Sequence, residues 1–192
     1  SGITHQFTGD LVDRFLKGLP YVLTGAQQRV LEEIEADLRT PHPMHRLLQG
    51  EVGSGKTVVA VATLLRGIEG GRQGAIMAPT EVLAEQHYMG VARLLADAGL
   101  NPDPHGASSD LGMESMFSSD GPAVHIALLT GSTALANYDT DISRSALLVD
   151  VASGQIDLLV GTHALIQEGV HFSALGVAVV DEQHRFGVAQ RV

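Results

Sequence analysis

The sequence contains no cysteine, and this absence limits both its chemistry and its compartment. Without cysteine there can be no disulfide and no thiolate chemistry. A reducing cytoplasm is therefore the expected location. No run of about eighteen apolar residues occurs, so we expect no membrane-spanning helix. The first residues also lack the basic and apolar parts of a signal peptide.

Positive charge is scarce as well. The formal net charge is −10, the only lysines are Lys17 and Lys56, and no Lys or Arg lies between Arg93 and Arg144. Attraction of the whole surface to nucleic acid is therefore excluded. Any contact with DNA must be local, or must be made by other parts of a longer protein.

What the sequence does have is enough length and apolar content for one sizeable domain. It has 192 residues, of which 44% are hydrophobic, so the chain can bury a substantial core. Its nine histidines show no metal-ligand spacing, and we expect no structural zinc site.

Residues 50–57 carry the clearest chemical pattern. They read Gly-Glu-Val-Gly-Ser-Gly-Lys-Thr and fit the phosphate-binding loop G-x-x-x-x-G-K-[ST]. A short, mostly apolar run at 46–49 predicts a strand before the loop, and residues 57–65 predict a helix after it. The turn's backbone N–H groups and the helix N-terminus then bind polyphosphate. The predicted nucleotide contacts are Gly50, Gly53, Ser54, Gly55, Lys56, which reaches the terminal phosphates, and Thr57, whose hydroxyl binds Mg²⁺.

Two acids at the end of an apolar strand supply the second half of such a site. Residues 176–180 run directly into Asp181 and Glu182. A bound nucleotide needs an acid that holds its Mg²⁺, and we assign Asp181 to that shell, through water. Glu182 is our candidate for the residue that polarises the attacking water. The alternative is a pair of exposed acids at a strand end, and the phosphate loop upstream makes it the weaker reading.

Strand and helix patterns alternate along the rest of the chain. Residues 1–18 are a lead-in that contains a short amphipathic helix, and residues 19–192 form the main domain. Thr24 and Gln27 predict a capping box at the next helix, whose apolar stripe is Val30, Leu31, Ile34 and Leu38. Further helices are expected at 81–98 and 142–152, strands at 74–78, 125–129, 156–160 and 176–180, and a long surface loop at 101–123.

This alternation predicts an α/β fold with a parallel β-sheet and helices on both faces. Ligands of such sheets bind beyond the carboxyl ends of the strands. Polar or glycine-bearing junctions follow each expected strand and should therefore share one edge. They are Gly50, Pro79-Thr80, Gly131-Ser132, Gly161-Thr162 and Asp181-Glu182.

Tyr21 and Gln27 each allow two interpretations, and two histidines lie near the expected site. The ring of Tyr21 could stack on adenine and the carboxamide of Gln27 could pair with its edge. Chemistry alone favours a core tyrosine and a capping glutamine. His163 and His184 each follow a strand at the expected ligand edge, where hydrogen-bonding roles are available to them.

The sequence Asp181-Glu182-Gln183-His184 resembles motif II of superfamily 2 helicases. Longer segments resemble the RecG family of branched-DNA helicases. They are Leu-Pro-Tyr-Val-Leu-Thr-Gly-Ala-Gln at 19–27, the loop segment at 47–57, Ala-Pro-Thr-Glu-Val-Leu-Ala-Glu-Gln-His at 78–87, Gly-Thr-His-Ala-Leu-Ile-Gln at 161–167, and Asp-Glu-Gln-His-Arg-Phe-Gly-Val-Ala-Gln-Arg at 181–191. Phe is commoner than Tyr21 in the family, and residues 101–123 look like an insertion.

The resemblance implies a RecA-like P-loop motor domain that uses ATP and Mg²⁺. It implies an ATP-dependent DNA helicase that remodels stalled forks and Holliday junctions in recombination and repair. The expected partner is branched DNA, and the protein is expected to be a nucleoid-associated monomer. The resemblance also makes Tyr21 and Gln27 adenine contacts. It assigns DNA contact or coupling to Pro79, Thr80, Gly161, Thr162 and His184.

Two alternatives remain beside this reading. The transcription-repair coupling factor shares His-Arg-Phe-Gly-Val, although its box normally reads Asp-Glu-Glu-His, and Gln183 favours the RecG side. A nucleotide-binding module that does not hydrolyse is the second alternative. Because the chain ends shortly after motif II, we expect a first motor domain without the second motor domain or the wedge domain. Such a chain should bind nucleotide but hydrolyse it poorly.

Overall fold

The computed structural model describes residues 10–19, 22–38, 56–102 and 123–181. Within these ranges, the side chains of residues 34, 35, 37, 38 and 56 are not described. The helices are α1 (Leu11–Lys17), α2 (Gly25–Leu38), α3 (Lys56–Glu69), α4 (Glu81–Asp97), α5 (Arg144–Ser153) and α6 (His163–Gly169). The strands are β1 (Gln73–Ala78), β2 (Ile126–Leu129), β3 (Ala134–Ala136), β4 (Leu158–Thr162) and β5 (Leu175–Val180).

The strands form one sheet in the order β3-β2-β4-β1-β5. The pairs β2–β4, β4–β1 and β1–β5 are parallel, as predicted. One edge strand, β3, was not predicted, and it pairs antiparallel with β2. The tight turn before β3 explains this, because Thr130 N–H donates to the Thr133 carbonyl and Thr133 N–H donates to the Thr130 hydroxyl.

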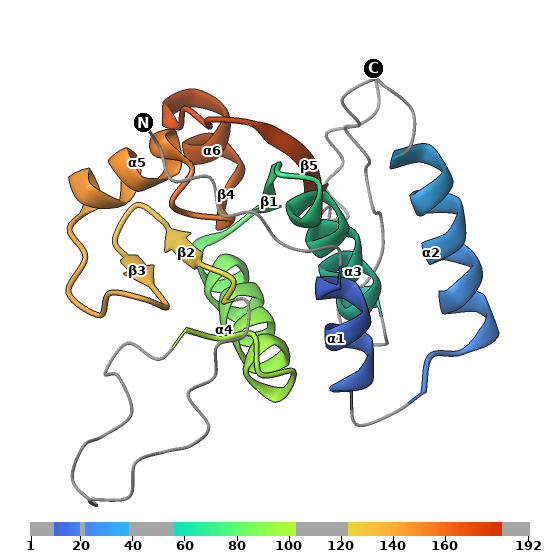
Figure 1. Cartoon of the computed structure of the whole chain (residues 1–192). Helices are drawn as coiled ribbons and strands as arrows, with labels where there is room; N and C mark the ends of the chain where they lie inside the picture. The colour runs from blue at the N-terminus through green and yellow to red at the C-terminus, as the bar shows by residue number, and fades with distance from the viewer. Residues whose placement is uncertain (1–9, 20–21, 39–55, 103–122, 182–192) are drawn as a thin grey trace, which may run out of the picture.

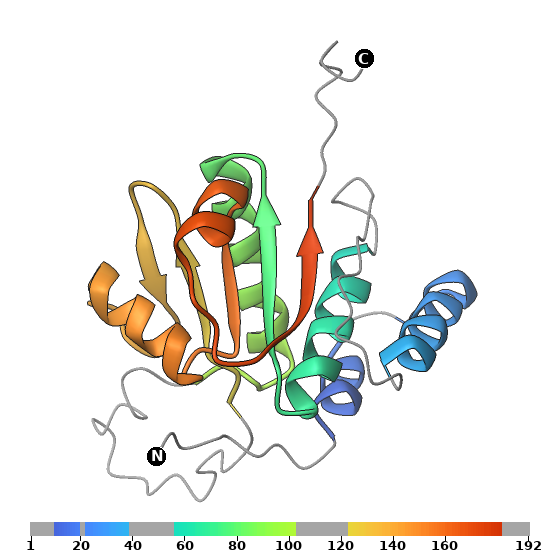
Figure 2. The ribbon, with the colours of Figure 1, turned by 90° about the horizontal axis from the view of Figure 1, so that it is seen from above.

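Helices cover both faces of the sheet, which confirms the expected layering (Figure 2). Alternate residues of each strand face opposite cores. Ile76 and Ala78 of β1 pack with α1, α3 and α4, whereas Ala75 and Met77 pack with α5 and α6. Helix α2 lies further out and contacts α3 (Figure 1).

Several helix ends are capped by residues that the sequence analysis predicted. Thr24 N–H donates to Gln27 Oε1 at 2.9 Å and Gln27 N–H donates to Thr24 Oγ1 at 3.2 Å, which confirms the capping box. The predicted helix stops Gly99 and Gly154 both have positive φ. In α2 Leu31 is buried but Val30 is 37% exposed, so Val30 was wrongly placed on the packed stripe.

The start of α5, the end of β4 and the presence of α6 differ from expectation. Helix α5 begins at Arg144 because Ser143 caps it by accepting from Ala146 N–H, and Ile142 lies before the helix. Strand β4 continues through Thr162, since Gly161 and Thr162 pair with Met77 and Ala78 of β1. Helix α6 was not predicted. The expected strand at 46–49 and nearly all of the loop at 101–123 lie outside the described residues.

The lead-in helix is confirmed and belongs to the same core as the sheet. Leu11 and Phe15 of α1 are fully buried in the cluster that contains α3 and α4. The backbone N–H of Val12 donates to Glu69 Oε1 at the end of α3, at 2.7 Å. Among the described residues, no helix has the length and apolarity needed to cross a membrane.

Candidate nucleotide site

The carboxyl ends of the four parallel strands meet at one edge of the sheet, as the sequence predicted. Met77 lies beside Gly161 on one side and beside Val180 on the other, and Gly161 lies beside Leu129. The residues that follow these positions therefore gather at this edge. They are Pro79 and Thr80 after β1, Thr130 after β2, His163 after β4 and Asp181 after β5.

Helix α3 begins at the same end of the sheet at which β5 ends (Figure 2). Its first residue is Lys56 and its second is the partly buried Thr57, as expected for a helix that follows a phosphate loop. The helix has fourteen residues, and the first N–H groups of such a helix favour an anion. The predicted contacts Gly50, Gly53, Ser54 and Gly55 and the side chain of Lys56 lie outside the description.

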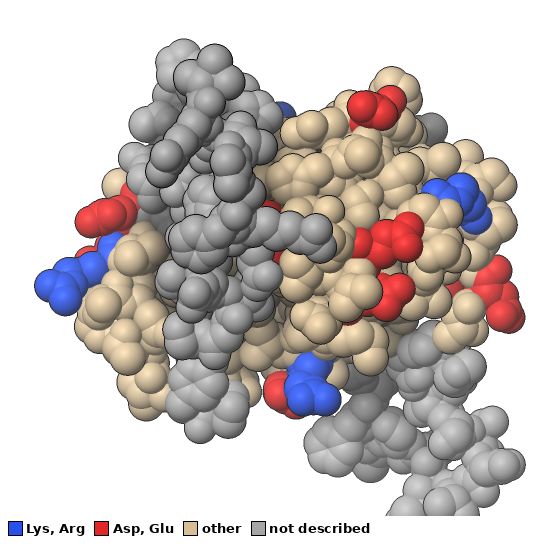
Figure 3. Space-filling view, turned by 180° about the vertical axis from the view of Figure 1, so that it is seen from behind, with Lys and Arg blue, Asp and Glu red and all other residues tan. Residues whose placement is uncertain are grey.

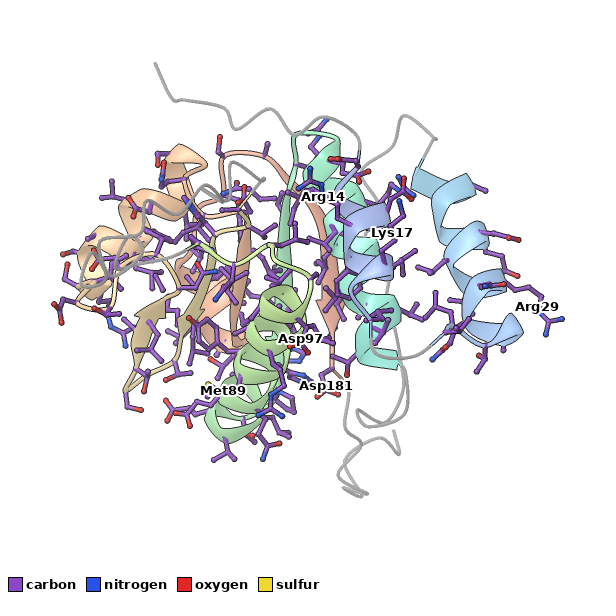
Figure 4. The ribbon with its side chains drawn as sticks, turned by 60° about the horizontal axis from the view of Figure 1, so that its bottom comes forward. Arg14, Lys17, Arg29, Met89, Asp97 and Asp181 are labelled. Carbon is purple, nitrogen blue, oxygen red and sulfur yellow. The ribbon has the colours of Figure 1, made fainter. Side chains whose placement is uncertain are left out.

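Asp181 is buried, with 5% of its surface exposed, and two elements hold it. Its backbone N–H donates to the Met77 carbonyl at 2.8 Å, which extends the pairing of β5 with β1. Its Oδ2 lies 2.6 Å from Nε2 of His87 on α4. Figure 4 shows Asp181 at the end of the sheet beside α4 and near α3. The carboxylate thus lies at the edge where α3 begins.

The second carboxylate oxygen makes the site suitable for Mg²⁺. Oδ1 of Asp181 is buried and accepts no hydrogen bond from the residues that the structure describes. A buried acceptor without a donor is costly, and a hydrated cation or its water would satisfy it. Mg²⁺ prefers oxygen ligands and keeps several waters, so Asp181 and the Thr57 hydroxyl fit the ion.

The residues assigned to DNA contact or coupling occupy different depths. Pro79 is exposed and Thr80 partly buried, and Thr80 caps α4 by accepting from Leu83 N–H at 3.2 Å. Gly161 lies inside β4, where a Cβ atom would approach the Leu129 carbonyl oxygen to 2.6 Å, so close packing requires this glycine. Thr162 ends β4 and is partly buried.

Of the remaining predicted site residues, the structure describes Gln27 and His163. Gln27 is partly buried on α2, where it forms the capping box. His163 begins α6, and its Nε2 lies 3.4 Å from the Asp181 carbonyl oxygen. Tyr21, Glu182 and His184 lie outside the described residues.

His87 is the site residue that our reading of the sequence missed. It is buried on α4 on the same face as Ala84, Tyr88 and Val91. The signal was present in the sequence, because tracing the apolar stripe back from Val91 by one helical turn reaches a histidine. A titratable side chain at such a position needs a polar partner, and the partner here is the predicted magnesium-binding acid.

Two groups with a raised pKa, Asp157 and Tyr138, lie at the opposite end of the parallel strands from the candidate site. Burial raises the pKa of Asp157, just before β4, to about 7, and His125 N–H partly offsets this by donating to its carboxylate. Burial and the bond to Asp150 raise the pKa of Tyr138 well above its usual range. These groups lie where the parallel strands begin, so they serve the fold there and not the candidate site.

Charge on the described surface is mixed. On the face shown in Figure 3, Lys and Arg side chains are scattered and form no continuous basic patch among the described residues. Arg144, near the site edge, donates to the carbonyl oxygens of Thr130 and Gly131. Ser132 donates its hydroxyl to Glu81 Oε2 at 3.2 Å. The turn after β2 is therefore held by polar contacts with α4 and α5.

Comparison with known proteins agrees with this geometry. The DEAD/DEAH box helicase family matches residues 24–192. The ATP-dependent DNA helicase RecG of Synechocystis is 48% identical over 183 residues, which is 95% of this chain and 18% of that protein. The protein of the same name from Bacillus subtilis is 47% identical over 190 residues, which is 99% of this chain and 24% of that protein.

A solved structure described as RecG bound to a three-way DNA junction matches 97% of this chain and 21% of its own, with a TM-score of 0.69 and 40% identity. The chain therefore spans between 18% and 24% of the length of these relatives, and the match supports the RecA-like α/β fold that the sequence predicted. The described sheet, the acid after β5 and the helix that begins at Lys56 lie within the matched residues. The chain belongs to the DEAD/DEAH box helicase family, and the relatives it resembles over nearly all of its length are RecG helicases.

Proposed function

We propose that the chain is the ATP-binding motor domain of an ATP-dependent DNA helicase that remodels branched DNA. The observation that carries this proposal is the position of Asp181. Its buried Oδ1, which accepts no hydrogen bond from the described residues, lies at the end of β5, at the sheet edge where α3 begins and where Pro79 and Thr80 follow β1. Nucleotide and DNA would thus meet along a single edge of the sheet.

Each predicted site residue would have a separate role in binding and hydrolysing ATP. Lys56 and the loop at 50–57 bind the phosphates, and Thr57 and Asp181 hold the hydrated Mg²⁺. A bound Mg²⁺ would supply positive charge against the negative charge that develops on the phosphate oxygens during transfer. Glu182 orients the attacking water and accepts its proton. Tyr21 and Gln27 contact the adenine.

Contact with DNA would rely on hydroxyl and backbone groups. Thr80 accepts from Leu83 N–H through its oxygen, which leaves the hydroxyl hydrogen available to a DNA phosphate. Thr162 and Pro79 lie at the same edge of the sheet as Thr80. His184 and Gly161 are the other two residues that we assign to DNA contact or coupling. With so few cations, the chain should bind fork DNA weakly and with a shallow dependence of affinity on salt. A steep salt dependence would contradict this.

Nucleotide titration and hydrolysis assays test the proposal. The chain should bind ADP and ATP in the presence of Mg²⁺, and Lys56→Ala should abolish binding. Glu182→Gln should spare nucleotide affinity but remove the residual single-turnover hydrolysis. If wild type and Glu182→Gln hydrolyse at the same rate, the chain is a nucleotide-binding module and not a motor domain.

We also propose that the chain alone turns over poorly, because groups from a second motor domain would normally stabilise the transferred phosphoryl group. Steady-state hydrolysis should be slow and should not respond to fork DNA. Rapid turnover that fork DNA stimulates would contradict this part of the proposal.

A further inference from the structure

The contact between His87 and Asp181 joins a helix to the candidate nucleotide site. His87 Nε2 lies 2.6 Å from Asp181 Oδ2, and both side chains are almost fully buried. A hydrogen bond from a strong donor stabilises a buried carboxylate. In this geometry the donor is Nε2–H of His87. The bond is therefore one of the polar contacts that fix the Asp181 side chain.

The two oxygens of Asp181 are thereby made different. Oδ2 is occupied by the ring of His87, and Oδ1 receives no hydrogen bond from the described residues. Rotation about the last side-chain bond of an aspartate is soft, so without His87 either oxygen could turn in either direction. The histidine selects one orientation, in which Oδ1 is the oxygen left for a ligand.

We propose that His87 is a positioning residue that orients the Asp181 carboxylate so that Oδ1 accepts from the water shell of nucleotide-bound Mg²⁺. This inference rests on the function proposed above. Groups that hydrogen-bond to a ligand of a metal typically change metal affinity about 10- to 100-fold when they are removed. His87 would act on magnesium in this way, through Asp181.

The position of His87 gives the contact a second consequence. Helix α4 begins after Thr80, and His87 follows seven residues later, about two turns along the helix. The helix that starts at the proposed DNA contact therefore also holds the proposed magnesium-binding acid. The two parts of the proposed site share one rigid element.

The test measures how much Mg²⁺ strengthens ADP binding to the 192-residue chain. ADP affinity is determined by calorimetry with excess Mg²⁺ and again with a chelator, and their ratio is the magnesium gain. His87→Leu should lower this gain about 10-fold and leave affinity in chelator unchanged. His87→Gln, whose amide nitrogen can replace Nε2, should retain most of the gain.

A matched control separates positioning from stability. Leu95→Ala removes a buried side chain two turns further along α4, and should lower the melting temperature without changing the magnesium gain. If His87→Leu lowers the melting temperature but keeps the wild-type gain, His87 has a structural role only and the inference is wrong.

A second measurement needs no destabilising variant. The ring ¹⁵N resonances of His87, assigned by their loss in His87→Gln, should shift when Mg²⁺ is added to the wild-type ADP complex. Unchanged resonances would overturn the inference. If wild type binds ADP with no magnesium gain, or fails to bind ADP at all, the proposed function itself fails, and the wild-type titration alone reveals it.

Discussion

The backbone N–H of Val12 donates to Oε1 of Glu69 at 2.7 Å and joins the first helix to the last turn of α3. The other oxygen of Glu69 accepts from Arg66 at 2.9 Å, so both carboxylate oxygens are engaged. Helix α3 carries Lys56 and Thr57 in its first turn. The lead-in therefore anchors the far end of the helix that supplies the proposed phosphate contacts.

Removal of this anchor should destabilise the protein. Glu69→Ala leaves the Val12 N–H in α1 without its acceptor and removes the Glu69–Arg66 ion pair, and should cost about 1–3 kcal/mol of unfolding free energy. Glu69→Gln keeps an oxygen for Val12 and should cost less. Urea unfolding of both variants checks the order, and equal stability of Glu69→Ala and wild type would contradict it.

Stability should depend on pH through Asp157. Its pKa is about 7 in the folded protein against an ordinary 3.8, so the folded state holds the proton more tightly than the unfolded state. The contribution of the neutral group is complete below about pH 4 and is lost as the pH rises to about 7.

Asp157→Asn tests this sign, because the amide keeps an acceptor for His125 N–H and carries no charge. The variant should be more stable than wild type at pH 8 by roughly 2–4 kcal/mol and show little difference near pH 4. Asp97→Asn, at an exposed position, is the control and should show a constant difference. A constant difference for Asp157→Asn as well would refute the assignment.

Gln27 should have separable effects on stability and on nucleotide affinity. Its oxygen accepts from Thr24 N–H, so Gln27→Glu keeps the capping box but loses the amide donors that adenine pairing requires. Gln27→Glu should remain within about 0.5 kcal/mol of wild type, and we expect ATP affinity to fall about 10-fold, as loss of 1.4 kcal/mol implies. Wild-type ATP affinity in this variant would show that Gln27 is only a cap.

Much of the fold follows from patterns within short segments. The capping box at Thr24, the glycines after α4 and α5, and the acid that follows β5 were each predictable because local chemistry determines them. The edge strand β3 was not, since three residues give no periodicity and its pairing depends on the Thr130 turn. The end of β4 was misplaced because pairing with β1 extends the strand through Thr162.

The candidate site was predictable where one motif defines it and not where distant segments meet. Asp181 stood out because it ends an apolar strand. His87 did not, because its role comes from a contact with a residue 94 positions away. Gln73 is similar, since its buried amide donates to the carbonyls of Val151 and Ile156. Such contacts depend on the assembled sheet.

Thr80 should also have two separable roles. Thr80→Ala removes the cap of α4 and should cost about 1 kcal/mol. Thr80→Asp keeps a capping oxygen but places a negative charge at the proposed DNA edge, so stability should persist while affinity for fork DNA falls. Thermal unfolding and a DNA titration at fixed salt check both parts. Unchanged DNA affinity in Thr80→Asp would remove Thr80 from the proposed contact.

A crystal structure of the chain with a non-hydrolysable ATP analogue and Mg²⁺ tests the central claim most directly. We predict that the triphosphate lies at the N-terminus of α3 and that the magnesium shell includes the Thr57 hydroxyl and a water bound to Asp181 Oδ1. Nucleotide found at another edge of the sheet, or magnesium beyond the reach of Asp181, would contradict the account.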